Sequence, residues 1–339
     1  MVSDKVAQFQ QLLGQLFAAM NNHDPAVLGK IKALLEKIPE EPNLLHLAGL
    51  ACADQNQLGE ATDYFLRSLS RQPQQPEVHN NLANVYAKQA KDTLAEKHYR
   101  QALELNPNFR DARKNLGLLL TSVNPMAAIE ELDRAAAMAL NDSSTLTGLG
   151  DAHKALENFE TAKDFYQRAL QINPNQVTAR HNLGLCLKLN EQVDLAIDSY
   201  KLALNLAPDN AEIHYNYANA LFERGEHEQA EREYLISLKL NPNFVLAHET
   251  LHEFYWQKGE HEKLEQSYRR AIAQAPRDTA LRLSYINALS AIGREEAALQ
   301  QLEEALPVET TAALLHAQGR LLANKQDYVR AQAVFSKAL

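Results

Sequence analysis

The sequence predicts an all-α protein in which short pairs of helices are stacked side by side. Two features of the 339-residue chain favour this fold class: it has only 12 glycines and 12 prolines, and six of the prolines recur at a regular spacing. Few turn-forming residues leave little material for the many tight turns of a β-sandwich or β-barrel. Apolar residues make up 45% of the chain and charged residues 23%, a balance typical of folded globular proteins.

The spacing of the prolines indicates an internal repeat of 34 residues. Four of the five intervals are 34 residues long, and the fifth, of 67, joins one period of 34 to one of 33. The prolines in question are Pro73, Pro107, Pro174, Pro208, Pro242 and Pro276. A period of this length is typical of repeat architectures. Placing each proline near the end of its unit divides the chain into units 42–75, 76–109, 110–142, 143–176, 177–210, 211–244, 245–278, 279–311 and 312–339, the last incomplete.

Each unit is expected to form two antiparallel helices of about 13 residues, because apolar positions recur at intervals of three and four in each half. Small residues recur at the eighth and twentieth positions of most units, as in Gly150 and Ala162, and an aromatic such as Tyr166 follows four residues later. Small side chains let two helices approach closely, and the ring fills the space beside them. No pair can bury its apolar face alone, so the pairs must stack.

The later units depart from this pattern. His252 and Ile286 stand at the eighth position, and Leu264 stands at the twentieth, where the other units have glycine or alanine. We therefore expect looser or re-angled helix packing in the units at 245–311.

This set of spaced residues resembles the tetratricopeptide repeat family over residues 42–339. The resemblance implies a right-handed superhelix, an α-solenoid of about nine helix pairs, with a concave groove lined by the first helix of each pair. Residues 1–41 lack the small-residue signature but contain two amphipathic stretches, Val6–Met20 and Ala26–Ile38, so we expect an N-terminal capping helix pair there.

The C-terminus stops inside a second helix, with Val334, Phe335 and Leu339 near its end. Soluble monomers usually cover such apolar surface. The sequence therefore predicts that the chain is a fragment of a longer protein, or that a partner covers this edge. Self-association through this last repeat, burying Phe335 and Leu339, is a third possibility.

Asparagine recurs at the sixth position of the units, and this pattern suggests a peptide-binding groove. The residues are Asn81, Asn115, Asn182 and Asn216. In the family this position faces the groove, and the pattern is similar to the asparagine ladder in the repeats of O-linked N-acetylglucosamine transferase, which holds substrate peptide backbones. A primary amide offers both a donor and an acceptor to a peptide bond. The alternative is that these amides hydrogen-bond the neighbouring helix.

Other polar and aromatic residues are expected near the same groove. Three positions after the ladder lie Asn84 and Asn219, and Lys154 and Lys188 add positive charge further along the helices. Tyr215, Phe222 and the single tryptophan, Trp256, are candidates for a hydrophobic anchor site; the alternative is that they pack against one another as core.

Signatures of catalysis are missing, and one metal motif is attributed to chance. His248 and His252 complete a literal HExxH pattern, but His248 shares its repeat position with His79 and His214, so we interpret the match as a coincidence of helix packing. Phosphate-binding loops and nucleophile elbows are not found, and we expect neither a cofactor nor an active site within these residues.

The composition of the chain limits the classes of partner that it is expected to bind. With a net charge of −9 the chain is a poor ligand for nucleic acid, and no apolar stretch is long enough to cross a membrane. Without an export signal, a cytoplasmic location is the expectation. The sequence thus predicts a scaffold that binds an extended peptide or a partner helix in its groove. The alternative is the N-terminal substrate-recognition arm of a glycosyltransferase, sulfotransferase or iron/2-oxoglutarate oxygenase, whose catalytic domain lies beyond Leu339.

Overall fold

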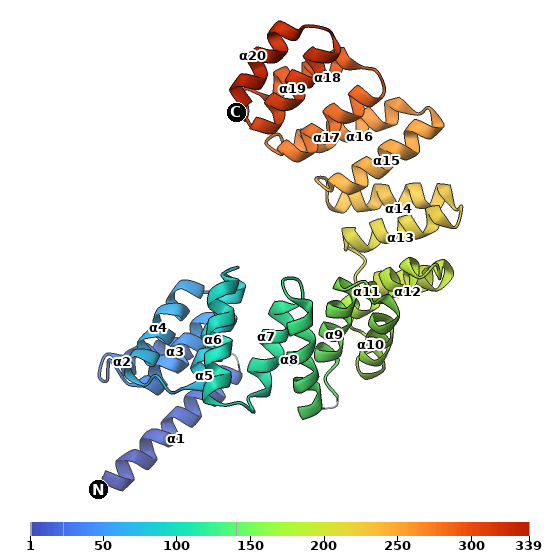
Figure 1. Cartoon of the computed structure of the whole chain (residues 1–339). Coiled ribbons are helices and arrows are strands. Elements are labelled where there is room, and N and C mark those ends of the chain that lie inside the picture. The colour runs from blue at the N-terminus through green and yellow to red at the C-terminus, as the bar shows by residue number, and fades with distance from the viewer. Residues whose placement is uncertain (1, 23, 140, 339) are drawn as a thin grey trace. The chain divides into compact units, whose positions relative to one another are not determined.

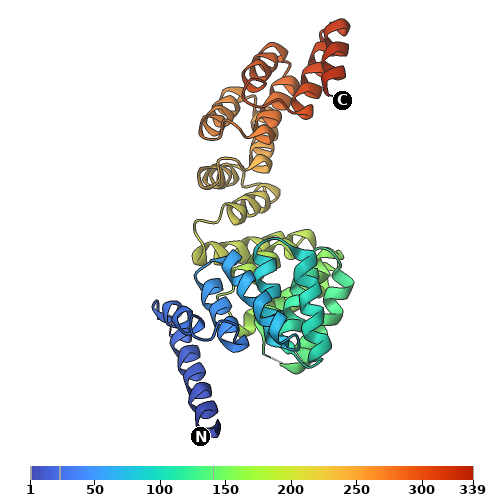
Figure 2. The same cartoon turned by 90° about the vertical axis from the view of Figure 1, so that its left-hand side faces the viewer.

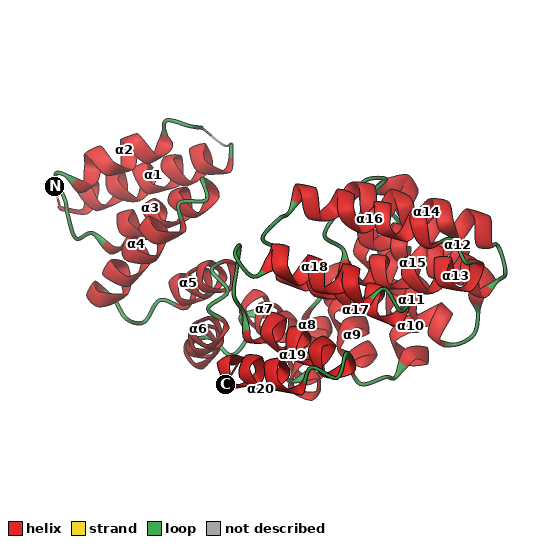
Figure 3. Ribbon diagram, turned by 90° about the horizontal axis from the view of Figure 1, so that it is seen from above, coloured by secondary structure: helices red, strands yellow, loops and turns green. Residues whose placement is uncertain are grey.

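The structure, a computed structural model, describes residues 2–22, 24–139 and 141–338. Within these residues the chain forms 20 helices and no strand, as the red and green ribbon of Figure 3 shows. None of the described helices is both long enough and apolar enough to cross a membrane.

The chain divides into two compact units, residues 1–179 and 180–339, which are described separately. The first unit contains α1 (Val2–Asn21), α2 (Val27–Leu35), α3 (Pro42–Asp54), α4 (Leu58–Arg71), α5 (Pro76–Lys88), α6 (Asp92–Leu105), α7 (Arg110–Leu120), α8 (Pro125–Met138), α9 (Ser143–Ala155) and α10 (Phe159–Ile172). Helix α11 (Val177–Leu189) begins at the boundary. The second unit continues with α12 (Val193–Leu206), α13 (Ala211–Glu223), α14 (His227–Leu240), α15 (Val245–Lys258), α16 (His261–Gln274), α17 (Thr279–Ala291), α18 (Glu295–Ala305), α19 (Ala312–Asn324) and α20 (Tyr328–Ala338).

Consecutive helices pack as pairs within each unit. In the first unit α3 packs on α4, α5 on α6, α7 on α8 and α9 on α10, and each pair also contacts the next (Figure 1). The second unit repeats this arrangement, for example in α13 with α14 and α19 with α20. We call the earlier helix of each pair the first helix and the later one the second helix. The predicted all-α solenoid is thereby confirmed.

The close crossing within a pair depends on one small residue opposite one large one. A Cβ atom placed on Gly150 would lie 2.5 Å from the ring of Tyr166, and one on Gly184 would lie 2.6 Å from the ring of Tyr200. Both tyrosines are completely buried. The ring therefore occupies the volume that a side chain at the glycine would need, which is the physical reason for the recurrent pairing of small and aromatic residues in the sequence.

The helix starts are set by local chemistry. Pro42 and Pro76 occupy the first turns of α3 and α5, where proline removes no intrahelical hydrogen bond. Asp142 and Asn210 cap α9 and α13, accepting hydrogen bonds from the amides of Ser144 and Ile213. These features divide the chain into short helices at the ends of the 34-residue units.

The pair α15–α16 in the second unit is more open than the pairs α3–α4, α5–α6, α7–α8, α9–α10, α13–α14, α17–α18 and α19–α20, as predicted. Helix α15 approaches both α14 and α16 less closely than the equivalent helices between α3 and α10 of the first unit approach each other, and α17 and α18 are also more widely spaced than most pairs. His252 and Leu264 lie at the crossing of α15 and α16, where bulk replaces the usual glycine and alanine. Larger side chains at a crossing hold the helix axes apart.

Helices α1 and α2, at the start of the first unit, contact the rest of that unit through few residues. Helix α1, in dark blue at the N-terminus in Figures 1 and 2, contacts α2 and α3 while its N-terminal end projects away from them. Helix α2 buries an apolar face that includes Ile31 and Leu35.

At the other end of the chain, Phe335 packs beside Gly319 within its own pair and is half-buried. The large exposed apolar residues of α20 are Tyr328 and Val329. Leu339 lies outside the described residues, so the predicted self-association through Phe335 and Leu339 stays a prediction.

Candidate functional site

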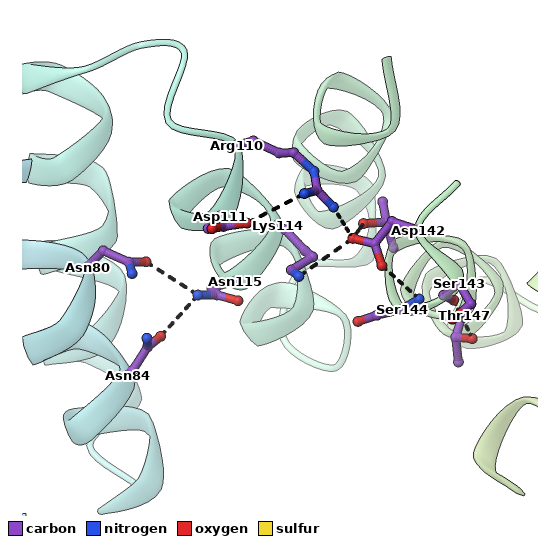
Figure 4. Close-up of polar contacts among 11 residues, drawn as sticks. Asn80, Asn84, Arg110, Asp111, Lys114, Asn115, Asp142, Ser143, Ser144 and Thr147 are labelled. Carbon is purple, nitrogen blue, oxygen red and sulfur yellow. Dashed lines mark hydrogen bonds and ion pairs between the residues drawn. The ribbon is translucent and has the colours of Figure 1, made fainter. Parts of the chain in front are cut away.

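The asparagines of the predicted groove lie on the first helices, and three of them form hydrogen bonds to the preceding first helix. In the first unit Asn115 on α7 donates from Nδ2 to Oδ1 of Asn84, at 3.0 Å, and to Oδ1 of Asn80, at 3.3 Å, both on α5 (Figure 4). Its amide thus connects two neighbouring pairs.

The same connection recurs with histidine as the acceptor. Nδ2 of Asn81 lies 2.9 Å from Nε2 of His46, and Nδ2 of Asn216 lies 2.9 Å from Nε2 of His181. Since the amide nitrogen can only donate, the histidine Nε2 must accept and therefore carries no proton. Burial lowers the pKa of His46 to about 4, which agrees with a neutral acceptor. The fourth asparagine of the ladder, Asn182, is buried at 8% exposure.

The partners of these asparagines were missed by the sequence analysis, although the sequence contains a signal for them. His46, Asn80, His181 and Tyr215 all stand at the fifth position of their units, one residue before the ladder position. Tyr215 forms a similar contact, with its hydroxyl 3.2 Å from the Oγ1 of Thr250. A polar fifth residue in one pair followed by a polar sixth residue in the next predicts a hydrogen bond between the two first helices.

Asn84 and Asn219 accept hydrogen bonds from buried tyrosines of their own pairs. The hydroxyl of Tyr99 donates to Oδ1 of Asn84 at 2.6 Å, and the hydroxyl of Tyr234 donates to Oδ1 of Asn219 at 2.6 Å. Burial raises the pKa of both tyrosines, so both hydroxyls stay protonated and act as donors. The carbonyl oxygens of these two asparagines therefore help to hold each pair together.

The two candidate lysines have different surroundings. Nζ of Lys188 lies 3.5 Å from a carboxylate oxygen of Glu223, on the next first helix. Lys154 on α9 is half-buried and has no ion pair among the described residues.

A charged network joins α7 to the start of α9 in the first unit (Figure 4). Asp142 forms an ion pair with Arg110, and its carboxylate lies 3.5 Å from Nζ of Lys114. Burial of the carboxyl acts to raise the pKa of Asp142, but the hydrogen bond from Thr145 and the two cations hold it below its usual range. These cations are thus engaged within the fold.

A hollow of about 530 Å³ opens between α1, α3 and α5, and we call it the N-terminal hollow. Its lining combines apolar and polar side chains of the first unit: Met20, Leu50, Ala53, Asp54, Phe65, Asn81, Asn84, Val85 and Lys88. Two of the predicted groove residues, Asn81 and Asn84, therefore meet at one concave site. Lys88 is exposed and has no ion pair among the described residues.

The three candidate anchor aromatics do not stack on one another. Tyr215 packs against Phe244, with ring centroids 5.0 Å apart, and Phe222 packs against His227 at 4.9 Å. Trp256 is 43% exposed and lies beside His261, at 5.3 Å between centroids. Each ring therefore belongs to a separate contact.

His248, the first histidine of the HExxH pattern, is engaged in packing of the repeat, and the ring of His252 lies 6.5 Å from that of Trp256. Nε2 of His248 donates to the carbonyl oxygen of Pro242 at 2.9 Å, the same contact that His214 makes with Pro208. The ring of His248 also stacks on Tyr268, with centroids 4.7 Å apart. Among the described residues no group of three His, Cys, Asp or Glu side chains is placed to hold a metal ion.

Comparison with known families finds the same repeat in several segments. Models described as "Tetratricopeptide repeat" match residues 76–109, 143–176, 165–198 and 187–252. A model described as "Bacterial transcriptional activator domain" matches residues 235–322.

Individual proteins share parts of the chain or its fold. Protein O-mannosyl-transferase TMTC3 of Homo sapiens is 33% identical over 113 residues, which make up 32% of this chain and 12% of that protein. The crystal structure of the APC/C hetero-tetramer Cut9-Hcn1 has a TM-score of 0.60 at 23% identity, over 68% of this chain and 46% of that one. A monomeric IFIT1 mutant with m7Gppp-AAAA has a TM-score of 0.60 at 18% identity, over 93% of this chain and 76% of that one. At these identities the structural likeness shows the fold alone.

Proposed function

Since the chain contains tetratricopeptide repeats, we propose that it is a protein-interaction scaffold that binds an extended peptide on the exposed side of its first helices. The observation that carries the proposal is the N-terminal hollow, where Asn81, Asn84 and Lys88 line about 530 Å³ of open space together with apolar side chains. Apolar concave sites with a few well-placed polar groups are the usual form of ligand sites.

The two asparagines keep hydrogen-bonding capacity for a ligand. Asn81 uses its NH2 group on His46, while its carbonyl oxygen receives only a long contact of 3.4 Å from Asn80. Asn84 uses its carbonyl oxygen on Tyr99 and Asn115, and its NH2 group forms no hydrogen bond among the described residues. One acceptor and one donor are the complement of a peptide bond, which supports recognition of a backbone rather than of particular side chains.

Lys88 and the apolar floor of the hollow are expected to determine which peptide sequences bind. An exposed, unpaired ammonium group at the rim favours a peptide with a carboxylate close to the bound segment. Met20 and Leu50, which are partly exposed, offer apolar contact to a side chain that enters the hollow. We therefore assign the ladder asparagine Asn81, together with Asn84 and Lys88, to peptide binding in the first unit.

The proposal is tested with peptides selected from a random phage-displayed library on the full chain. We expect these peptides to bind the Lys88→Glu variant about ten-fold more weakly in calorimetry, the loss of one charge-assisted hydrogen bond. The matched control is Lys37→Glu, which makes the same charge change at an exposed residue outside the hollow. Peptides that bind Lys88→Glu as tightly as the wild type would place the binding site elsewhere.

A second candidate function is favoured by the match to the human O-mannosyl-transferase, in which the similar segment is 12% of a larger enzyme. In this reading the chain is the substrate-recognition arm of a glycosyltransferase or another enzyme with a further domain. Reading the gene past the codon for Leu339 decides between the two: an in-frame catalytic domain supports the arm, and a stop codon excludes it.

A further inference from the structure

A second hollow, of about 640 Å³, lies on the second helices of the second unit, and we call it the second-helix hollow. Its walls come from α14 and α16, and its floor includes His248 and Tyr255 of α15. It therefore differs from the N-terminal hollow, which involves mostly first helices of the other unit.

The open packing of α15 accounts for this hollow. His252 and Leu264 hold α15 and α16 apart, and α15 also stays farther from α14 than equivalent helices do in the first unit. The equivalent space between the second helices α6 and α8 of the first unit measures only about 240 Å³, so the space is larger where the packing is more open. The size of the hollow thus accompanies bulky residues at two positions of one repeat.

The floor of the hollow is apolar. Leu235, Leu238, Tyr255 and Ala271 line it, and Leu235 is 43% exposed although it lies beside buried neighbours. A hollow of this volume falls within the range of about 300–1,000 Å³ seen for ligand pockets. An apolar side chain of a partner can therefore be buried against this floor.

The rim of the hollow is positively charged. Lys239, Lys263 and Arg270 line it with a single carboxylate, that of Glu231. Glu231 already accepts from the hydroxyl of Tyr255 at 3.1 Å and lies within 4 Å of two lysines. Lys239 and Arg270 are exposed and form no ion pair among the described residues.

The positions of these cations favour a ligand with several carboxylates over one with a single carboxylate. Lys263 and Arg270 are seven residues apart on α16, which is about 10 Å along the helix axis. Lys239 stands on the opposite wall, on α14. Lys263 is already paired with Glu231 and Glu260, so Lys239 and Arg270, on opposite walls, are the cations left for a ligand. A peptide can present a carboxylate to each of them, on both sides of an apolar residue.

We propose that the second-helix hollow is a docking site for an acidic peptide segment of a partner protein, which inserts a large apolar side chain between Leu235, Leu238 and Ala271 and places flanking carboxylates on Lys239 and Arg270. The charge complementarity is local, because the chain as a whole carries −9. This site is independent of the proposed peptide site on the first helices.

The test uses the full chain and fluorescein-labelled probes in fluorescence anisotropy. The peptide EELFEE-amide, with fluorescein on its N-terminal amine, is expected to bind about ten-fold more tightly than KKLFKK-amide and EEGGEE-amide labelled in the same way, which lack the negative charges or the apolar residues. The double variant Lys239→Glu/Arg270→Glu is expected to weaken binding of the acidic peptide at least about ten-fold. Gln266→Trp, which fills the hollow without changing its charge, is also expected to weaken it.

The matched control is Lys201→Glu/Lys337→Glu, which makes the same change in net charge at exposed residues that do not line the hollow, and it is expected to bind like the wild type. Helical circular dichroism identifies any variant that fails to fold. The proposal is overturned if the acidic peptide does not bind at about 1 mM, if the control weakens binding as much as the hollow variants, or if dodecanoate binds in place of the peptide.

Discussion

At the scale of single residues, the buried tyrosines of the second helices show how one polar partner changes the role of a side chain. Tyr166 and Tyr234 donate their hydroxyls to Asp151 and Asn219, which stand at the ninth position of their pairs. Tyr200 is as deeply buried, but the ninth residue of its pair is Leu185, and its hydroxyl has no hydrogen-bond partner among the described residues.

This difference predicts opposite outcomes for the same substitution. Tyr234→Phe removes a made hydrogen bond and leaves the carbonyl of Asn219 without its donor, so we expect a loss of about 1 kcal/mol in the free energy of unfolding. Tyr200→Phe removes an unpaired buried hydroxyl, so we expect no loss or a gain of up to about 1 kcal/mol. Urea unfolding of the two variants measures both, and equal losses would contradict the assignment.

The sequence predicted the position of the ladder asparagines on the first helices but not the direction of their amides. Periodicity shows which residues share a repeat position, whereas the partner of an amide depends on the neighbouring helix. Asn81 and Asn216 turn toward the histidines that happen to precede them by 35 residues. The anchor aromatics Tyr215 and Trp256 were treated as one group for the same reason, because helical spacing does not specify which rings meet.

At the scale of helices, the pair α15–α16 is the element whose packing differs most from its neighbours. The bulk of His252 and Leu264 was visible in the sequence, and the looser packing it predicted is present. The hollow that results was not predicted, because its volume depends on how far α14 and α16 stand apart on either side of α15.

Local stability is expected to follow this packing. Fewer close contacts between helices lower the free energy of local opening. In hydrogen exchange followed by mass spectrometry, we expect the amides of α15 and α16 to exchange faster than those of α13 and α14, the better-packed pair of the same unit. Protection of α15 and α16 equal to that of α13 and α14 would show that the open spacing costs no stability.

At the scale of the whole molecule, net charge is the property that the sequence alone determines. The structural likeness to an IFIT1 mutant with a capped RNA fragment concerns the fold, and this chain carries 43 acidic against 34 basic residues. Binding to phosphates requires basic surface that releases counterions, which an acidic chain does not offer in general.

We therefore expect no retention of RNA at physiological salt. A gel-shift assay with a labelled single-stranded oligonucleotide, with and without a 5′ cap, is expected to show no complex at protein concentrations of about 10 µM, where weak non-specific binders already form one. A complex that persists at this concentration, and weakens as salt is raised, would contradict this expectation.

The hydrogen bonds between successive first helices also give two of the described junctions, α3–α5 and α11–α13, the same direction. The earlier helix supplies the acceptor, as His46 and His181 do, and the later helix supplies the amide donor, as Asn81 and Asn216 do. A transplanted repeat must therefore match its new upstream neighbour: a repeat with asparagine at its sixth position, placed after one whose fifth residue is apolar, would lose the acceptor that His46 and His181 provide here. The order of repeats in this chain is therefore constrained by the donors and acceptors at the junctions as well as by the stacking of apolar faces.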